Sequence, residues 1–373
     1  MHSVSQKKVL IAGASGLVGH AALREFEHDL DWEVVGVSRR KPLLSGRATH
    51  VSVDLLDRGR CTEVFGQMSD VTHVVYGAVN EDPTDLVAGW RDRDRMQMNQ
   101  TMLENLFEPL LPVSTNLQHV SLMQGTKAYG GVAGIDVGFT YRERAPRVQH
   151  DNFYFLQEDY LRAKQSGKLW SWTVLRPVLI LGDAVGSNLN ILLVIGVYAA
   201  LRKEAGLPLA YPGLPEPGPT ELVDSDLLGR ALKWAATASG ARNEIFNVSN
   251  GDVVAMPDLY PAIAEEMGME MGPPEASLFT TELPKQADAW AAIVRKYDLA
   301  APEDLRAVVG GSMELADGAR HPTRSDSRPR RLGGHSSTIR LRQAGFHDCM
   351  DSEDAVRKWF RRFHELRLLP PLE

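Results

Sequence analysis

The first half of the chain alternates short apolar runs with longer stretches in which apolar residues recur at helical spacing. Lys8–Ala12 is a nearly uninterrupted apolar run, which is typical of a parallel strand buried on both faces. Further strand signals lie at Glu33–Val37, His50–Val53, Val71–Tyr76, Gln118–Met123 and Trp172–Leu175, and helix signals at Met96–Leu111 and Phe155–Ser166. This alternation predicts an α/β fold with a doubly wound parallel sheet that carries helices on both faces.

The pattern changes after Arg176-Pro177. A long, almost wholly apolar helix is expected at Leu189–Glu204, followed by turns rich in proline and glycine. Glu244–Val248 has the pattern of one more buried strand, which we expect to return to the first sheet. The chain should therefore comprise a sheet domain over residues 1–180 and a smaller, mainly helical C-terminal lobe over residues 181–373, with their elements interleaved.

One stretch of the C-terminal half departs from both patterns. Gly310–Ser337 is rich in Arg, Gly, Ser and His, contains no aromatic residue and shows almost no apolar periodicity. Such a composition predicts a loop or disordered insert over residues 310–337. Ordinary patterning resumes beyond it, and Ala355–Leu366 is expected to be an amphipathic helix.

Three glycines directly follow the first predicted strand. Gly13 allows a tight turn, Gly16 lets backbone N–H groups approach a pyrophosphate, and Gly19 lets the next helix lie close to the sheet. The positive end of that helix then faces the phosphates. Strand, glycine turn, helix and second strand together are the layout of a Rossmann-like dinucleotide-binding unit.

The second strand ends in Ser38-Arg39-Arg40. An acidic residue at this place would hold a ribose 2′-hydroxyl, whereas arginine suits a 2′-phosphate through charge-assisted hydrogen bonds. We therefore expect NADP(H) rather than NAD, although an arginine cluster in a solvated loop would leave the same pattern. Asp54-Leu55, after the third strand, is placed to hold the adenine.

Two tyrosine–lysine pairs could do chemistry beside such a cofactor. Reductases built on this unit use a tyrosine hydroxyl to polarise a substrate carbonyl, with a lysine ammonium nearby. Tyr160 and Lys164 have the spacing that puts both side chains on one helix face. Lys127 and Tyr154 come from separate segments, one after a strand and one at a helix start. Spacing alone leaves both assignments open.

The segments around the second pair carry a family resemblance. Gly125–Tyr129 is similar to a Gly-x-Lys-His-Tyr segment, and Asn152–Asp159 to Asn-Phe-Tyr-Tyr-x-x-Glu-Asp with only the first of the two tyrosines kept. The chain thus resembles the progesterone 5β-reductase/iridoid synthase-like (PRISE) family, an atypical branch of the short-chain dehydrogenase/reductases. Further matching stretches, within about residues 8–267, are Val37–Arg40, Asp54-Leu55, Arg176-Pro177, Val197–Ala200, Gly206–Leu209 and Asn243–Asp252.

The resemblance implies an NADPH-dependent reductase of activated C=C bonds. NADPH would deliver hydride to the β-carbon of a small, apolar enone or enal, while Tyr154 and Lys127 stabilise the enolate. The chain departs from the family at Ala78-Val79 and Met123-Gln124, where relatives often have Thr-Trp and Gln-Thr. The expected cofactor-binding residues are Gly13, Ser15, Gly16, Leu17, Val18, Gly19, Ser38, Arg39, Arg40, Asp54, Leu55, Ala78, Ile180 and Ser187.

Other readings of the same residues stay open at this point. A carbonyl reductase or a nucleotide-sugar epimerase or dehydratase would use the same Rossmann unit, and a non-catalytic NADP(H)-binding regulator could keep the cofactor site alone. Such a regulator could dispense with Tyr154 and Lys127, so their presence favours an enzyme. Glu158 and Asp159 are expected to be helix N-terminal carboxylates that interact with the helix dipole.

Composition and charge limit the kinds of binding partner and compartment that can be expected. A net charge of −7 and a pI near 5.9 argue against general nucleic-acid binding. Two cysteines, Cys61 and Cys349, fit a reducing compartment and supply no metal site. The longest apolar stretch, Leu189–Leu201, is shorter than the about 20 residues that span a bilayer. We therefore expect a cytoplasmic protein without metal, nucleic acid or membrane, and the sequence leaves a homodimer open.

Overall fold

A seven-stranded parallel sheet organises the N-terminal part of the computed structural model, which describes residues 7–42, 46–82, 84–130, 135, 138–213, 218–320 and 334–372. The strand order is β10-β7-β5-β4-β1-β2-β3, and every neighbouring pair is parallel. The strands are β1 (Lys7–Ala12), β2 (Trp32–Ser38), β3 (Thr49–Ser52), β4 (His73–Tyr76), β5 (His119–Met123), β7 (Ser171–Pro177) and β10 (Glu244–Val248).

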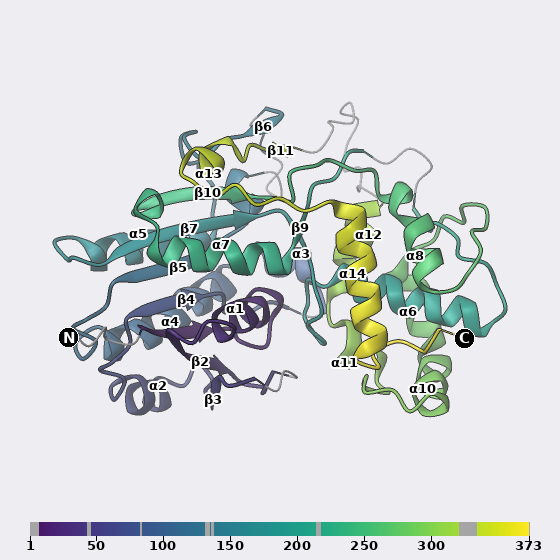
Figure 1. Ribbon diagram of the computed structural model, residues 1–373, viewed down its shortest axis with the longest axis horizontal. Coiled ribbons are helices and arrows are strands. Elements are labelled where there is room, and N and C mark those ends of the chain that lie inside the picture. Colours follow the sequence, from purple (N-terminus) through teal and green to yellow (C-terminus); the bar gives the residue numbers. More distant parts are fainter. Residues whose placement is uncertain are drawn as a thin grey trace.

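Helices cover both faces of this sheet (Figure 1). Val9 and Ile11 pack with one set of helices, whereas Leu10 and Ala12 pack with the other, because successive side chains of a strand point to opposite faces. The first face carries α1 (Leu17–Glu27) and α7 (Ser225–Thr237), and the second carries α2 (Arg58–Phe65), α4 (Arg93–Leu110) and α5 (Phe153–Gln165). The predicted doubly wound, Rossmann-like fold is confirmed.

The strand order reverses between β1 and β4. From β1 the chain winds outward through β2 to β3, and then returns to the other side of β1 to build β4 and β5. In open α/β sheets the carboxyl ends of the strands at such a reversal leave a crevice in which ligands bind. The fold therefore directs attention to the segments that follow Ala12 and Tyr76.

The C-terminal half forms a mainly helical lobe beside the sheet (Figure 1). Its core surrounds α6, whose residues from Ile191 to Leu201 are all buried. β10 leaves this half and joins the sheet edge beside β7. The lobe contains α6 (Ile191–Glu204), α8 (Tyr260–Glu266), α9 (Phe279–Glu282), α10 (Ala287–Lys296), α11 (Leu305–Val309), α12 (Ser312–Arg320) and α14 (Ser352–Glu365).

Short elements complete the described chain. Two small parallel sheets pair β6 with β11 and β8 with β9. Within the described ranges, no helix combines the length and apolar character needed to cross a membrane. The remaining strands and α-helices are β6 (Thr140–Tyr141), β8 (Leu179–Leu181), β9 (Leu222–Asp224), β11 (His335–Ser336), α3 (Leu86–Gly89) and α13 (Ile339–Gln343), and the 3-10 helix η1 (Thr126–Tyr129) follows β5.

The expectation of a loop or disordered insert over residues 310–337 is wrong for its first part. Ser312–Arg320 forms α12, in which Met313 and Ala316 are buried in the core around α6. Its Asp317 accepts hydrogen bonds from the backbone N–H groups of Phe279 (2.7 Å) and Thr280 (3.0 Å), at the start of α9. Because only a narrow stripe of α12 is buried, its apolar residues show little periodicity along the sequence. Residues 321–333 lie outside the described residues.

Candidate active site

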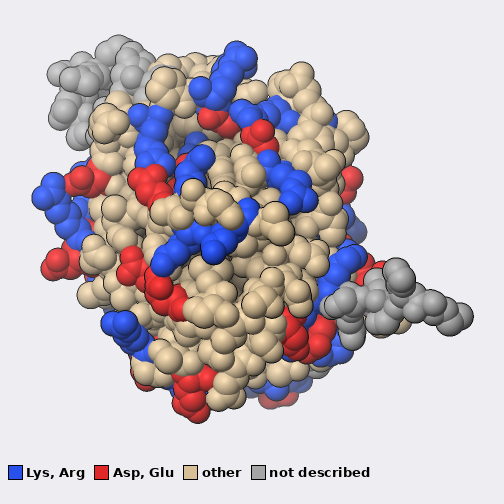
Figure 2. All heavy atoms as spheres, turned by 90° about the vertical axis from the view of Figure 1, so that its left-hand side faces the viewer, with Lys and Arg blue, Asp and Glu red and all other residues tan. Residues whose placement is uncertain are grey.

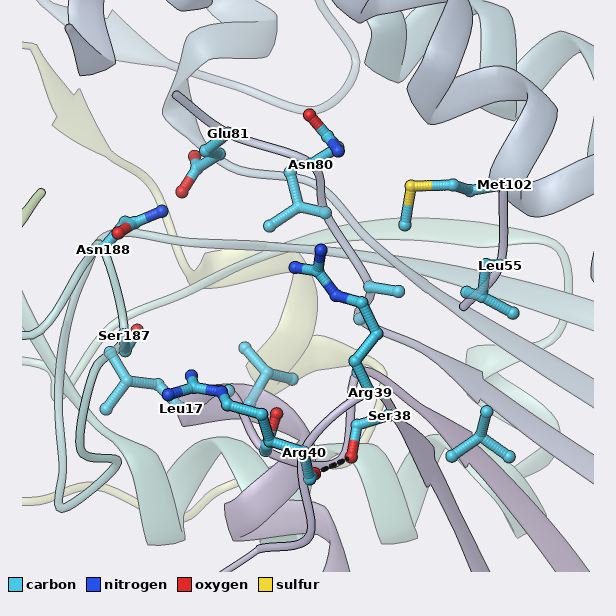
Figure 3. A pocket seen from close by; sticks show the side chains of 18 of the residues that line it. Leu17, Ser38, Arg39, Arg40, Leu55, Asn80, Glu81, Met102, Ser187 and Asn188 are labelled. Atoms are coloured by element: carbon cyan, nitrogen blue, oxygen red, sulfur yellow. Dashed lines mark hydrogen bonds between the residues drawn. The ribbon is translucent and has the colours of Figure 1, made fainter. Parts of the chain in front are cut away.

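A cleft opens where the strand order reverses, at the carboxyl ends of β1, β2 and β4 (Figure 3). Its empty volume is about 1110 Å³, counted with the open mouth. Every expected cofactor residue except Gly19 lines it: Gly13, Ser15, Gly16, Leu17, Val18, Ser38, Arg39, Arg40, Asp54, Leu55, Ala78, Ile180 and Ser187.

The glycine turn forms the floor of the cleft. Gly13 has a positive φ of 83°, and a Cβ there would lie 2.7 Å from the backbone nitrogen of Ala78. A Cβ on Gly19 would lie 2.2 Å from the Gly13 carbonyl oxygen. Gly19 therefore allows α1 to pack closely against the glycine turn, and it does not line the cleft. Gly16 precedes α1 and provides no side-chain cap, which leaves the first amides of that helix for phosphate oxygens.

Two arginines form one wall of the cleft. The buried Ser38 hydroxyl donates to the Arg40 carbonyl (2.6 Å), which fixes the turn after β2. Both guanidinium groups extend into the cleft, Arg40 on the side of Ser187 (Figure 3). Arg40 also donates to the Gly186 carbonyl (3.3 Å), so the loop from the helical lobe meets the end of β2 there. Two cations at this strand end provide a site for a phosphate.

Lys127 and Tyr154 lie together beyond the Glu81 end of the cleft. Lys127 is on η1, directly after β5, and Tyr154 is in the first turn of α5. Asn152 connects the two segments: its side-chain oxygen accepts from the Tyr154 backbone N–H (3.0 Å), and its amide donates to the Lys127 carbonyl (3.2 Å). The Lys127 Nζ consequently lies 5.3 Å from the centre of the Tyr154 ring.

The Tyr154 hydroxyl is held at a glycine. A Cβ placed on Gly125 would lie 3.3 Å from this hydroxyl oxygen and 3.6 Å from the Pro177 carbonyl. Few real Cβ atoms have contacts as short as 3.3 Å, so the hydroxyl occupies space that a side chain at Gly125 would contest. The absence of a side chain at this position therefore helps to place the phenol.

Burial sets the titration of both groups. It lowers the pKa of Lys127 to about 8, and the Glu81 carboxylate, 3.8 Å from Nζ, opposes this effect. Burial also raises the pKa of Tyr154, with a further upward contribution from Glu81 and a downward one from Arg176. The tyrosine is thus a protonated hydrogen-bond donor at neutral pH, and the pKa of the lysine lies well below its usual range.

The other tyrosine–lysine pair lies away from the cleft. The Tyr160 hydroxyl and the Lys164 ammonium both contact one oxygen of Glu108 on α4, at 2.8 and 2.7 Å. That carboxylate is 53% exposed, so the pair belongs to a solvated seam between α5 and α4. Such pairs are common at a protein surface, and Figure 2 shows acidic and basic side chains interspersed on the face of the molecule that it draws. The structure does not bring Tyr160 and Lys164 to the predicted cofactor residues.

Glu158 differs from its expected role. Its side chain is only 4% exposed and lies under the tyrosine segment, where it accepts from Gln124 (3.1 Å) and Arg162 (3.0 Å). Gln124 in turn donates to the Tyr154 carbonyl (3.1 Å) and accepts from Arg176 (2.8 Å). The expectation of helix N-terminal carboxylates is wrong for Glu158 and Asp159, because α5 begins at Phe153 and its first turn contains no acidic residue.

Glu81 is a site residue that the sequence did not single out. It lines the cleft in the segment after β4, and its side chain is 4% exposed. An acidic residue in the loop that follows the carboxyl end of a central strand, here β4, is the signal that could have found it. In the part of the chain that the structure describes, no group of three or more His, Cys, Asp or Glu side chains is placed to hold a metal ion.

Comparisons with known proteins agree with this geometry. Residues 49–310 match the model of a family described as a PRISE-like Rossmann-fold domain. The chain is 32% identical to the (S)-8-oxocitronellyl enol synthase of Antirrhinum majus, over 81% of this chain and 80% of the relative. It is 33% identical to the 3-oxo-Delta(4,5)-steroid 5-beta-reductase of Arabidopsis thaliana, over 70% of this chain and 68% of the relative.

Solved structures show the same fold at low identity. The UDP-glucose 4-epimerase of Thermotoga maritima superposes with a TM-score of 0.64 at 14% identity, covering 96% of this chain and 99% of the other. The UDP-glucose 4-epimerase of Thermus thermophilus superposes with a TM-score of 0.62 at 17% identity, covering 95% and 98%. At such identities the likeness concerns the fold alone.

Proposed function

This chain belongs to the family of PRISE-like Rossmann-fold domains, and we propose that it is an NADPH-dependent reductase of activated C=C bonds. It is an oxidoreductase, as are relatives such as the plant steroid 5-beta-reductase. The observation that carries the proposal is the convergence of Tyr154 and Lys127 beside a cleft lined by the glycine turn and two arginines.

NADPH is the cofactor that fits the cleft. The glycine turn brings the uncapped start of α1 to the cleft, where a pyrophosphate would bind, and a Cβ at Gly13 would clash with the backbone of Gly77 and Ala78 and disturb this turn. Arg39 and Arg40 line the far end, where the 2′-phosphate that distinguishes NADPH from NADH would need two cations. When bound, NADPH supplies the hydride.

Tyr154 and Lys127 supply the electrostatic part of the reaction. Hydride addition at the β-carbon of an enone or enal puts negative charge on the carbonyl oxygen. The Tyr154 phenol, kept protonated because burial raises its pKa, donates a hydrogen bond to this oxygen as the enolate forms. The Lys127 ammonium, 5.3 Å from the Tyr154 ring, adds positive charge in a site with little water.

The substrate we propose is a small, mostly apolar enone or enal. Trp90 and Phe153 contribute aromatic surface around Lys127, with ring centres 4.0 and 5.6 Å from its Nζ. An apolar wall with a few convergent polar groups is typical of small-molecule sites. The names of two relatives, an oxocitronellyl enol synthase and an oxo-steroid reductase, describe ligands of this general kind.

A substrate panel tests the proposal. NADPH oxidation is measured with enones and enals beside their saturated analogues, with products identified by mass spectrometry and NMR. We expect saturated carbonyl products, at least about a hundredfold slower in Tyr154→Phe and unchanged in Tyr160→Phe. Alcohol products would assign a carbonyl reductase instead, and tight NADPH binding without turnover of any compound would favour a regulator.

A further inference from the structure

Lys127 has a buried carboxylate as its neighbour. Glu81 follows β4, lines the cleft and places Oε1 3.8 Å from the Lys127 Nζ. The Glu81 side chain is 4% exposed and that of Lys127 is 16% exposed, so both charges lie largely out of water. A buried charge without a partner is costly, which makes this ion pair a determinant of how Lys127 behaves.

Trp90 contacts both members of the Glu81–Lys127 ion pair. Its indole N–H donates to Glu81 Oε1 (3.1 Å), and its ring centre lies 4.0 Å from the Lys127 Nζ. One side chain thus orients the carboxylate and also contacts the ammonium through its aromatic face. The ammonium is held between a carboxylate and three aromatic rings, those of Trp90, Phe153 and Tyr154.

Few other charges face this lysine. Arg176 on β7 affects the Tyr154 phenol, and the contact between the His150 ring and Lys127 is to the lysine backbone carbonyl (3.2 Å). Among the described residues, Glu81 is the single carboxylate that forms an ion pair with the Lys127 ammonium. Burial alone would favour the neutral amine, so the positive charge of Lys127 depends on Glu81.

We propose that Glu81 is a positioning residue, anchored by Trp90, that holds the Lys127 ammonium beside Tyr154 and keeps it charged near neutral pH. The inference deepens the proposed function and rests on it, since it explains how a lysine in a dry site can stabilise an enolate. Glu81 need not touch the substrate for this role.

A titration of Lys127 in the full chain tests this directly, without cofactor. Lysine side-chain carbons are labelled with ¹³C, and the Lys127 signal is identified as the one missing in Lys127→Arg. We expect a midpoint of about 8 in the wild type. In Glu81→Gln the midpoint should fall by at least about one pH unit, because an adjacent opposite charge shifts a pKa by roughly one to three units.

Two further variants keep the test decisive. Asp82→Asn is the matched control, because Asp82 is the next carboxylate along the chain but pairs with Arg95 (3.1 Å); it should leave the Lys127 midpoint in place. Trp90→Phe keeps an aromatic ring and removes the donor to Glu81, so we expect a smaller downward shift. This variant also serves if Glu81→Gln does not fold.

Kinetics separate this inference from the proposed function. For a downward shift of one pH unit in Glu81→Gln, kcat at pH 8 should fall about fivefold, with less than about twofold change at pH 6, where the lysine is mostly charged in both proteins. An unshifted midpoint in both Glu81→Gln and Trp90→Phe would overturn the role of Glu81 even if the wild type reduces enones. A shifted midpoint in a wild-type protein that reduces nothing would support the ion pair and contradict the proposed function.

Discussion

Two tyrosine–lysine pairs involve the same helix, α5, and their surroundings could hardly differ more. Tyr154 and Lys127 lie beside the cleft, and the carboxylate that faces this lysine is 4% exposed. Tyr160 and Lys164 share Glu108, a carboxylate that is 53% exposed. Charge interactions are several times stronger in a dry site than at a solvated surface, so only the first pair can contribute much to a reaction.

The two pairs also show that sequence spacing does not by itself place a tyrosine and a lysine at the cleft. Tyr160 and Lys164 satisfy the four-residue spacing, but that spacing only places both side chains on one helix face, here the face toward Glu108. Lys127 and Tyr154 have no local spacing in common and meet because Asn152 contacts both segments. The pair that matters is therefore made by tertiary structure.

The largest effect is expected when the two tyrosine–lysine pairs are removed in turn and their contributions to activity are compared. Tyr154→Phe and Lys127→Ala should each lower kcat/KM for an enone by at least about a hundredfold, the scale of a lost acid–base or oxyanion-type contact. The matched variants Tyr160→Phe and Lys164→Ala should stay within about twofold of the wild type. Steady-state kinetics at pH 7 provide the measurement, and equal losses in both pairs would contradict the assignment.

A second test moves the tyrosine without removing it. Gly125→Ala puts a Cβ 3.3 Å from the Tyr154 hydroxyl, and we expect kcat to fall about tenfold while the Tyr154 side chain remains. The control is Gly318→Ala on α12, where a Cβ meets nothing within 4 Å. If Gly125→Ala keeps full activity, the exact position of the Tyr154 hydroxyl does not matter for the reaction, which would contradict the role assigned to Tyr154.

The pH dependence should distinguish the pairs more finely. Because the pKa of Lys127 is lowered to about 8, its ammonium is complete below that pH and is lost above it. Activity should therefore decline as the pH rises through about 8, by about tenfold for each further unit if the charged form is required. Lys164→Ala should show the same profile as the wild type. A rate that stays flat to pH 10 would show that the ammonium is dispensable.

The smallest expected effect concerns stability on the outer face of α5. Lys164→Ala removes a half-exposed ion pair to Glu108 and should lower the free energy of unfolding by less than about 1 kcal/mol. Urea denaturation followed by circular dichroism measures this change. A loss of several kcal/mol would indicate a structural role for the outer pair that its exposure does not explain.

The sequence predicts the sheet well because most of its strands are largely buried, although the edge strand β3 is partly exposed. Lys8–Ala12 is recognisable as an apolar run, and Glu244–Val248, predicted as one more buried strand, forms β10 as expected. Helix starts are less visible: α5 begins at Phe153, two residues before the predicted start, because the Asn152 side chain accepts from the Tyr154 N–H. Cap contacts of this kind need coordinates.

Other features lie outside what patterns can show. α12 buries Met313 and Ala316 in a narrow stripe. Because so few of its residues are apolar and buried, the sequence of this segment resembles that of a loop. Glu158 accepts a hydrogen bond from Gln124, and Glu81 forms an ion pair with Lys127, although these partners lie far apart in the sequence. Interactions between distant segments are set by tertiary packing, which a single sequence does not display.

The position to which hydride is delivered tests the central claim most directly. NADPH fully deuterated at C4 of the nicotinamide is supplied with an enal, and the product is examined by ²H and ¹³C NMR, with Tyr154→Phe as the control for background reduction. We predict a saturated carbonyl product with deuterium on the former β-carbon. Deuterium on the carbonyl carbon of an allylic alcohol would contradict C=C reduction and identify the protein as a carbonyl reductase.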